Sequence, residues 1–317
     1  MSGSVCVTGG AGFIGSHIAE AYLAAGWSVT CLDDLSRGKR EQVPAGARFV
    51  EADIRSREAH ELLADGGFDV LNHQAAQIDV RVSVEDPATD ASINLVGFAN
   101  LLAGAAKGRV SRVVFASSGG VVYGDPAVIP TPEPTATLPI SPYGVSKLAS
   151  EHYLRVLGTL GGFEGVALRY ANVYGPRQDP KSEAGVVSIF VSRVLAGQGL
   201  TIFGDGEQTR DYVYVGDVAR ASVLASGLAS VQRGDRLDVP AFNIATGTET
   251  TVNGLARHVM DALGREVPVE HAAARPGELV RSCLDISKAD RELGWRPEVP
   301  FAEGLAALAR WFEGMAR

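Results

Sequence analysis

The chain has 317 residues, of which 46% are hydrophobic and 21% charged, so it can bury a large core and is neither disordered nor fibrous. Its formal net charge is −8, and its Lys and Arg residues are not gathered into runs. We therefore expect neither a nucleic-acid partner nor a membrane partner, since both kinds of contact need clustered positive charge.

Three cysteines, Cys6, Cys31 and Cys283, are scattered along the chain without C-x-x-C spacing. This pattern predicts neither a disulfide framework nor a metal site, and it favours a reducing compartment. The N-terminus leads directly into an apolar strand pattern, and no apolar run approaches the ~20 residues that span a bilayer. We therefore expect a cytoplasmic protein without a signal peptide.

The first half of the chain alternates short β-branched runs with helical patterns. Strands are predicted at residues 4–7, 28–33, 48–51, 70–72 and 113–116, and helices at residues 14–25, 57–64, 91–106 and 142–157. Such alternation indicates right-handed βαβ crossovers and a parallel sheet covered on both faces. The predicted fold class is therefore α/β, with a Rossmann-type doubly wound parallel sheet.

The regular alternation weakens after about residue 169, where a Pro/Gly-rich segment has the composition of a loop. Beyond it, helices are predicted near residues 187–196, 215–228 and 252–263 and from residue 301, with strands at 200–203 and 241–244. These elements predict a smaller C-terminal α/β lobe over the carboxyl edge of the sheet, where ligands bind. We expect a nucleotide-binding lobe at 1–175 and a substrate lobe at 176–317, between which the chain can cross.

Glycines follow the first predicted strand in the run TGGAGFIG. Gly10, Gly12 and Gly15 match G-x-G-x-x-G, and Gly9, Gly12 and Gly15 also match G-x-x-G-x-x-G. Glycines at this spacing permit a tight turn, close approach of a pyrophosphate to the backbone, and packing of helix on strand. The pyrophosphate would rest at the positive end of a helix beginning near Phe13. By itself the motif is weak, because glycine-rich turns also serve structural purposes.

Acids follow the next two predicted strands. Asp33 lies about 20 residues beyond the glycines, where a carboxylate can hold the ribose hydroxyls of adenosine and would repel a 2′-phosphate. The glycine loop, the strand and this acid together predict NAD rather than NADP. Asp53 and Ile54 are placed to touch the adenine, although Asp53 is nearly as good a candidate for a helix N-cap.

The segment SPYGVSK opens the helix predicted at 142–157. Tyr143 and Lys147 are four residues apart and so share one helical face. The usual pKa of a phenol, about 10, is too high for a base at neutral pH. A neighbouring ammonium and a positive nicotinamide would both favour the phenolate. A chance Y-x-x-x-K is common, but downstream of a dinucleotide loop this pair predicts acid–base catalysis.

Ser118 ends the buried strand pattern that precedes this helix. It would stand at the carboxyl edge of the sheet, where its hydroxyl can bond a substrate hydroxyl. A turn serine is the structural alternative. The catalytic interpretation depends on the Tyr143–Lys147 pair.

These motifs resemble the extended short-chain dehydrogenase/reductase superfamily and, within it, the UDP-glucose 4-epimerase group of the NAD-dependent epimerase/dehydratase family. The resemblance covers the full length of the chain. Its motifs lie at residues 8–15, 33–36, 73–77, 117–120, 141–147, 169–176, 202–212 and 275–278. The resemblance implies that the first lobe binds NAD and the second a UDP-sugar.

The resemblance also implies roles for single residues, each named at its position in this chain. The implied catalytic residues are Tyr143, Lys147 and Ser118. The implied cofactor-binding residues are Gly9, Gly12, Phe13, Ile14, Gly15, Asp33, Asp53, Ile54, Gln74, Ala75, Ala76, Gln77, Asn94, Tyr143, Lys147 and Tyr170. The implied substrate-binding residues are Ser118, Tyr143, Asn172, Val186, Phe203, Arg210, Arg275, Glu278 and Ser282. The structural alternatives are that Arg210 and Arg275 are solvated surface charges, that Phe203 is a core residue and that Asn172 caps a turn.

Two departures from the family pattern stand out. Asp34 takes a place where the family usually has Asn, which puts a second acid near the adenosine. Ser118 is followed by Gly119 and Gly120, one residue more before Tyr123 than in many relatives, so we align it from the strand side. Dehydratase relatives carry an Asp-Glu pair at the positions of these two glycines.

The function implied is reversible C4 epimerisation of a UDP-hexose through a transient 4-keto sugar, with NAD regenerated in each cycle. Another NAD-dependent nucleotide-sugar dehydratase or reductase is the alternative, and a non-catalytic dinucleotide sensor would not need Tyr143, Lys147 and Ser118 together. Ser282, seven residues beyond Arg275, is small where a bulky Tyr would exclude an acetamido group. This favours acceptance of N-acetylated UDP-hexosamines.

Apolar residues on the helices predicted at 91–106 and 142–157 exceed what one sheet face needs. Relatives pair such helices into a dimeric four-helix bundle, so the resemblance implies a homodimer. Packing in the core explains the same residues equally well.

Overall fold

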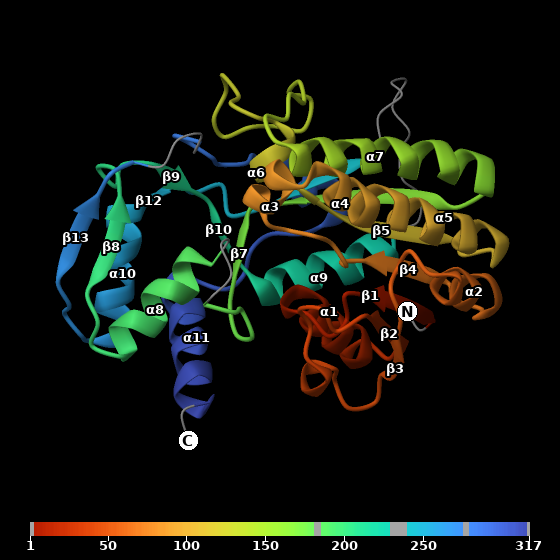
Figure 1. Ribbon diagram of the computed structural model, residues 1–317, viewed down its shortest axis with the longest axis horizontal. Coiled ribbons are helices and arrows are strands. Elements are labelled where there is room, and N and C mark those ends of the chain that lie inside the picture. Colours follow the sequence, from red (N-terminus) through yellow and green to blue (C-terminus); the bar gives the residue numbers. More distant parts are fainter. Residues whose placement is uncertain (1–2, 181–184, 229–239, 275–278, 316–317) are drawn as a thin grey trace.

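The computed structural model describes residues 3–180, 185–228, 240–274 and 279–315 (Figure 1). Within them, a central sheet of seven strands has the order β11-β6-β5-β4-β1-β2-β3, and every neighbouring pair is parallel. These strands are β1 (Ser4–Thr8), β2 (Ser28–Asp33), β3 (Arg48–Glu51), β4 (Val70–His73), β5 (Arg112–Ser118), β6 (Glu164–Tyr170) and β11 (Ala241–Ile244). The predicted Rossmann-type doubly wound sheet is therefore confirmed.

Helices cover both faces of this sheet (Figure 1). One face carries α2 (Arg57–Asp65), α5 (Phe98–Lys107) and α7 (Pro142–Gly161), and the other carries α1 (Phe13–Ala24), α9 (Val215–Ser226) and the π-helical turn η3 (Ala289–Leu293). Because both faces are covered, an inner strand is apolar along its whole length. In β1, for example, Val5, Cys6 and Val7 are fully buried.

Short elements connect these layers near the carboxyl edge of the sheet. They are the 3₁₀ turn η1 (Arg40–Gln42), α3 (Val80–Glu85), α4 (Pro87–Ala91), the π-helical turn η2 (Ser92–Gly97) and α6 (Gly119–Val122). The helix predicted at 91–106 is confirmed as a helical segment. It begins earlier, at Pro87, and contains the π-helical turn η2 between α4 and α5. The side chain of Asn94 bonds outside its own helix, and such π turns are frequent where a helix is adjusted to a functional site.

The second half of the chain crosses back to the first lobe. Strand β11 pairs with β6, with Phe242 opposite Leu168, and α9 packs on α1. Residues 176–317 therefore do not form the second lobe alone. The Pro/Gly-rich loop near residue 175 ends the first run of βα units, and the sheet edge beside β6 is completed by a later segment.

The smaller lobe has its own core around Phe190, Leu255 and Leu308. Its elements are β7 (Asn172–Tyr174), α8 (Val186–Leu195), β8 (Leu200–Phe203), β9 (Thr209–Arg210), β10 (Tyr212–Tyr214), β12 (Thr250–Thr251), α10 (Val252–Leu263), β13 (Val269–Ala272) and α11 (Phe301–Met315). They form three two-stranded sheets within the described residues, β10-β7, β12-β9 and β13-β8. Among the described helices, none is long and apolar enough to cross a membrane.

Candidate active site

The turn between β1 and α1 requires glycine at two positions. Gly9 has a φ of +67°, and a Cβ on it would lie 2.8 Å from the backbone nitrogen of Ala75. A Cβ on Gly15 would collide with the carbonyl oxygen of Gly9. The loop is therefore packed against the segment after β4 and leaves room for a ligand only at the backbone.

The N-terminus of α1 is suited to an anion. Gly12 is the N-cap, and no side chain from the described chain caps the helix or adds an acid to its first turn. Phe13 and Ile14 therefore begin a helix whose first N–H groups and positive dipole end face the glycine turn. This arrangement fits the pyrophosphate of a dinucleotide.

Asp33, at the end of β2, is held rigidly at the same edge. Its carboxylate accepts the N–H of Ala11 at 3.0 Å and that of Leu35 at 2.9 Å. Burial raises the pKa of Asp33, and these two hydrogen bonds oppose the rise. By contrast, Asp34 is exposed and bonds the backbone and hydroxyl of Ser36.

Asp53 follows β3, but it is not the helix N-cap that the sequence allowed. Ser56 caps α2 by accepting the N–H of Ala59 at 3.1 Å. The carboxylate of Asp53 instead binds the backbone and guanidinium of Arg55, and these bonds lower its pKa. Its neighbour Ile54 is buried in the core.

The segment after β4 lies beside the glycine turn. The hydroxyl of Thr8 accepts the N–H groups of Gln74 and Ala75, each at 3.2 Å. The side chain of Gln74 points into the protein, where it donates to Asn72 at 2.7 Å and to the hydroxyl of Tyr170 at 3.3 Å. Gln74 and Tyr170 thus brace the segment that also contains Ala76 and Gln77.

Asn94, which we expected near the nicotinamide, ties this segment to η2. Its amide oxygen accepts the N–H of Gln77 at 2.9 Å, and its amide nitrogen donates to the carbonyl of Gln77 at 2.9 Å. The same nitrogen donates to Asp90 at 2.9 Å. Asn94 therefore acts here as a cross-link between two segments of the cofactor edge.

Tyr143 and Lys147 lie on the first two turns of α7. Ser141 caps the helix through the N–H of Gly144, and Pro142 occupies its first turn. Both functional side chains are buried, with 9% and 4% of their surface exposed. The ammonium of Lys147 donates to the carbonyl of Ala116 in β5 at 2.8 Å and lies 5.7 Å from the centre of the Tyr143 ring.

The surroundings of Tyr143 and Lys147 shift the pKa of each side chain in the direction that favours its neutral form. Burial raises the pKa of Tyr143, and the charge of Asp90 raises it further. Burial lowers the pKa of Lys147 to about 8. His73, which stacks on Phe98 at the end of β4, is also kept neutral because burial lowers its pKa. Added positive charge from a nicotinamide would therefore help Tyr143 to ionise.

Two serines end β5, and their hydroxyls differ in burial and in hydrogen bonding. Ser117 is buried and donates to Glu151 at 2.5 Å. Ser118 is half-buried opposite Tyr170, and no described residue hydrogen-bonds its hydroxyl. Helix α6 begins just after Ser118 and approaches the first turn of α7, where a Cβ on Gly144 would lie 2.9 Å from the carbonyl oxygen of Val121. The catalytic role of Ser118 stays a prediction.

The residues expected to hold the substrate are distributed over the smaller lobe. Asn172 begins β7, Val186 begins α8, Phe203 ends β8 and Ser282 is half-buried next to Cys283. Arg275 and Glu278 fall outside the described residues.

Arg210 and Asp211 form the centre of that lobe's edge. The guanidinium of Arg210 donates to the carbonyls of Thr209 at 2.7 Å and Leu279 at 2.9 Å, which orient it. Asp211, which sequence reasoning missed, is buried and accepts the N–H groups of Thr246 at 2.8 Å and Gly247 at 2.9 Å. Its position next to an expected phosphate-binding Arg is the signal that could have found it.

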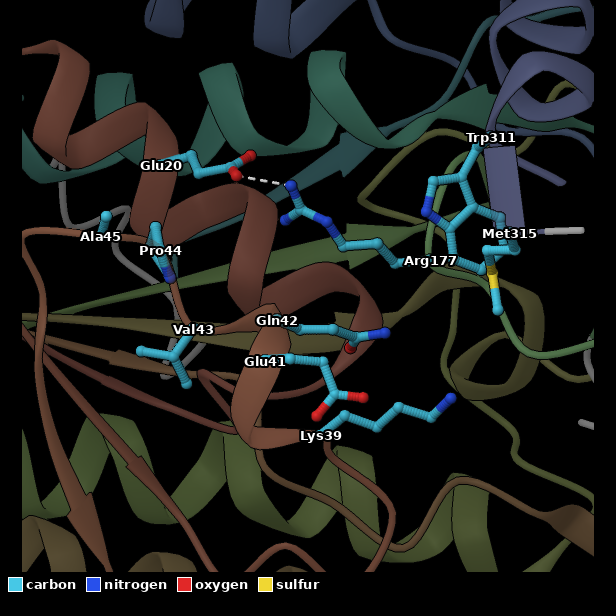
Figure 2. Close-up of a pocket in the computed structure, with 10 residues that line it drawn as sticks. All are labelled: Glu20, Lys39, Glu41, Gln42, Val43, Pro44, Ala45, Arg177, Trp311 and Met315. Atoms are coloured by element: carbon cyan, nitrogen blue, oxygen red, sulfur yellow. Dashed lines mark hydrogen bonds and ion pairs between the residues drawn. The ribbon is translucent and has the colours of Figure 1, made fainter. Parts of the chain in front are cut away.

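A separate pocket lies between the two lobes (Figure 2). Its volume is about 430 Å³, and it is lined by Glu20, Lys39, Glu41, Gln42, Val43, Pro44, Ala45, Arg177, Trp311 and Met315. Figure 2 shows the ion pair of Arg177 with Glu20, which joins the loop after β7 to α1. None of the expected catalytic or binding residues that the structure describes lines this pocket. In the described part of the chain, His, Cys, Asp and Glu side chains form no group suited to a metal ion.

The chain matches the model of the NAD dependent epimerase/dehydratase family over residues 5–245. The UDP-glucose 4-epimerase of Thermotoga maritima, solved with UDP-glucose, is 42% identical, with 99% of this chain and 100% of that chain covered and a TM-score of 0.92. The UDP-glucose 4-epimerase of Thermus thermophilus, solved with NAD, is 45% identical, with 98% and 99% covered and a TM-score of 0.89.

A third similar structure is that of an epimerase named for a different sugar. The UDP-N-acetylglucosamine 4-epimerase of Methanobrevibacter ruminantium, solved with UDP-N-acetylmuramic acid, is 34% identical, with 99% of both chains covered and a TM-score of 0.91. Together the matches confirm the resemblance that the motifs indicated. The chain therefore belongs to the NAD dependent epimerase/dehydratase family, and its cofactor is NAD.

Proposed function

We propose that the protein catalyses the reversible C4 epimerisation of a UDP-hexose, interconverting UDP-glucose and UDP-galactose. The observation that carries the proposal is that Lys147, one turn after Tyr143 on α7, donates to the carbonyl of Ala116 in β5, the strand that ends with Ser118 at the carboxyl edge of the sheet. A small phenol–ammonium–hydroxyl group at this edge is suited to moving one proton at a sugar hydroxyl.

Each of these three side chains has a distinct proposed role. Tyr143, as the phenolate, takes the proton of the 4-hydroxyl and later returns it to the 4-keto oxygen. Lys147 supplies the positive charge that favours the phenolate, and its bond to Ala116 sets its position. Ser118 orients the hydroxyl. NAD, when bound, accepts the hydride of C4 and gives it back to the opposite face.

Two features distinguish this proposal from dehydration. The acids that dehydratase relatives carry after the strand serine are replaced by Gly119 and Gly120 in α6. A Cβ on Gly119 would collide with the side chain of Leu284, so the packing disfavours an acid at this position, whereas a Cβ on Gly120 would meet only the hydroxyl of Ser118, at 3.9 Å. The relatives, which are UDP-sugar 4-epimerases, favour neither a reductase nor a dinucleotide sensor.

We place the nucleotide half of the substrate against the smaller lobe. Arg210 is oriented by two backbone carbonyls and is proposed to bind the diphosphate. Phe203 is proposed to lie beside the uracil and Asn172 beside the sugar diphosphate. Val186, Arg275 and Glu278 are proposed to complete this site, and the cofactor residues named from the motifs are proposed to hold NAD.

We expect the protein as isolated to convert UDP-glucose to UDP-galactose without added nucleotide, because each cycle restores NAD and the buried site can retain it. The measurement is proton NMR of the sugar products, together with assay of the nucleotide released on denaturation. We expect the denatured protein to release NAD in an amount equimolar with the protein. Release of NADP, or a requirement for stoichiometric NADH, would instead indicate a reductase.

N-acetylated UDP-hexosamines are proposed as additional substrates. Ser282 is small and half-buried, and the chain turns inward at the buried Cys283. We expect Ser282→Tyr to lower kcat/KM for UDP-N-acetylglucosamine by more than the ~10–200-fold that a methylene costs, because a ring would overlap the acetamido group. The rate with UDP-glucose is the internal control. Equal losses of kcat/KM with both sugars, or no loss with either, would show that another residue determines whether the acetamido group fits.

A homodimer is also proposed. On α7, Val145, Tyr153, Val156 and Leu160 form an exposed apolar stripe at helical spacing, and Val96 of η2 is exposed on the neighbouring helix. A second copy of the chain would cover both helices, which sedimentation of the purified enzyme can check. The three buried, unpaired thiols support our proposal that the enzyme works in the reducing cytoplasm.

A further inference from the structure

The carboxyl group of Asp90 is buried beside the catalytic helix. Asp90 lies in α4, just before the π-helical turn η2, and none of its surface is exposed. Burying a carboxylate is costly unless it is well bonded, so a folded protein keeps such a group where it has a structural or functional task. Asp90 belongs to none of the sequence motifs described above.

Three neutral groups hold the two carboxylate oxygens. The side-chain amides of Gln77 and Asn94 each donate to Oδ1 at 2.9 Å. The hydroxyl of Ser146 donates to Oδ2 at 2.6 Å. Since all three donors are neutral, they stabilise the charge without cancelling it.

These partners come from both sides of the reaction site. Gln77 belongs to the segment after β4 that is proposed to lie along the cofactor, and Asn94 belongs to η2. Ser146 lies in α7, directly before Lys147 and one turn after Tyr143. Asp90 is therefore the group that joins the cofactor edge to the catalytic helix.

Asp90 also affects both catalytic side chains electrostatically. Its charge adds to the effect of burial in raising the pKa of Tyr143. For Lys147, whose pKa burial lowers, Asp90 and Glu151 act in the opposite direction and favour the ammonium. The carboxylate thus holds the pair as a neutral phenol and a charged amine.

The other ionisable groups around this pair contribute less net charge. Glu151 of α7 is neutralised by Arg169, with which it forms a buried ion pair at 2.7 Å. His73 of β4 is neutral because burial lowers its pKa. On α3 and its N-cap, Arg81 and Asp79 pair with each other, and Glu85 and Asp86 are exposed to water.

We propose that Asp90 is a positioning residue of the redox site: its carboxylate fixes the cofactor segment to the catalytic helix and places a fixed negative charge next to Tyr143 and Lys147. This charge would oppose ionisation of Tyr143 until the positive nicotinamide is in place. The inference rests on the roles proposed above for Tyr143 and Lys147.

Asp90→Asn tests the charge with little change in shape. The Asn oxygen can still accept from Gln77 and Asn94, and its amide can donate to Ser146, whose hydroxyl then rotates. Loss of the negative charge lowers the pKa of Tyr143, and the phenolate is the active form. The acid limb of the kcat–pH profile should therefore move to lower pH by about one unit, the scale of one nearby charge.

Ser146→Ala is the matched control, because it removes one bond to the carboxylate and keeps the charge. We expect its acid limb to stay at the wild-type pH. If Asp90→Asn does not fold, Asp90→Ser is a smaller neutral variant for the same comparison. An unshifted limb in a folded neutral variant, or an equal shift in Ser146→Ala, would overturn the proposal.

A direct titration separates this inference from the proposed function. The absorbance change of tyrosinate is measured with NAD bound, and the signal of each protein's Tyr143→Phe counterpart is subtracted. We expect the remaining transition to occur at lower pH in Asp90→Asn than in the wild type. If Tyr143→Phe retains full activity, the assignment of the catalytic base is wrong. If it is inactive and the transition does not move, only the role of Asp90 is wrong.

Discussion

Replacing Tyr143 by Phe should lower the rate of UDP-glucose epimerisation by about 10²–10⁴-fold, the loss typical of a missing acid–base group. The phenol hydroxyl is the only part removed, and the buried ring remains, as does the bond that the Tyr143 backbone N–H donates to Ser83 of α3. We therefore expect an unchanged melting curve and unchanged NAD content, with the loss in kcat. The measurement is the initial rate with saturating UDP-glucose.

The same helix offers a matched control. Tyr153 is 44% exposed on the outer face of α7, so Tyr153→Phe makes the same chemical change away from the site. Its rate should equal that of the wild type. A Tyr143→Phe enzyme that is folded and nearly as fast as the Tyr153→Phe enzyme would show that another group moves the proton.

Arg169→Met should lower the free energy of unfolding by about 3–5 kcal/mol, the usual cost of removing one partner from a buried ion pair. Arg169 and Glu151 are only 8% and 4% exposed, and the guanidinium makes two bonds to the carboxylate, at 3.0 and 2.7 Å. It also donates to the hydroxyl of Tyr123 at 2.8 Å. The substitution leaves a buried, unpaired carboxylate on the catalytic helix. Denaturant unfolding with saturating NAD measures the change.

An exposed pair in the same protein provides the comparison. Arg296 bonds Asp290 at 2.6 Å, but its side chain is 72% exposed. Arg296→Met should leave the free energy of unfolding almost unchanged, because water replaces the lost bonds. Similar losses in the two variants would mean that the Arg169–Glu151 pair stabilises the fold no more than a surface pair does.

Local sequence patterns were sufficient for most elements of the first lobe. The predicted strands at 28–33 and 48–51 match β2 and β3 at both ends, because short runs of β-branched and apolar residues between turn residues mark strands. The edge strand β3 is only half-buried, however, whereas β2 is buried beyond its first residue. The helix carrying Tyr143 and Lys147 was also predicted, since Ser141 and Pro142 mark its start. The order of the elements and their apolar pattern predicted the doubly wound sheet.

Local sequence patterns could not predict contacts between segments that are distant along the chain. The sequence placed residues 241–244 in a strand but did not show that β11 completes the sheet beside β6. Nothing local distinguished Ser117 from Ser118, because adjacent strand residues differ only in the face to which they point. The bond from Ser117 to Glu151, which engages the hydroxyl of Ser117 and so favours Ser118 as the candidate, joins residues 34 positions apart.

The amino-acid sequence by itself determined that a glycine turn, an acid after β2 and a Tyr–Lys pair occur at spacings suited to NAD and a sugar hydroxyl. These spacings are local, since a turn or one helical face brings the residues together without help from the rest of the chain. Only the tertiary structure decided that Asp90 lies between the cofactor segment and α7. Two of its three partners are 13 and 56 residues away, and packing of separate elements, rather than any repeat in the sequence, brings them to one carboxylate.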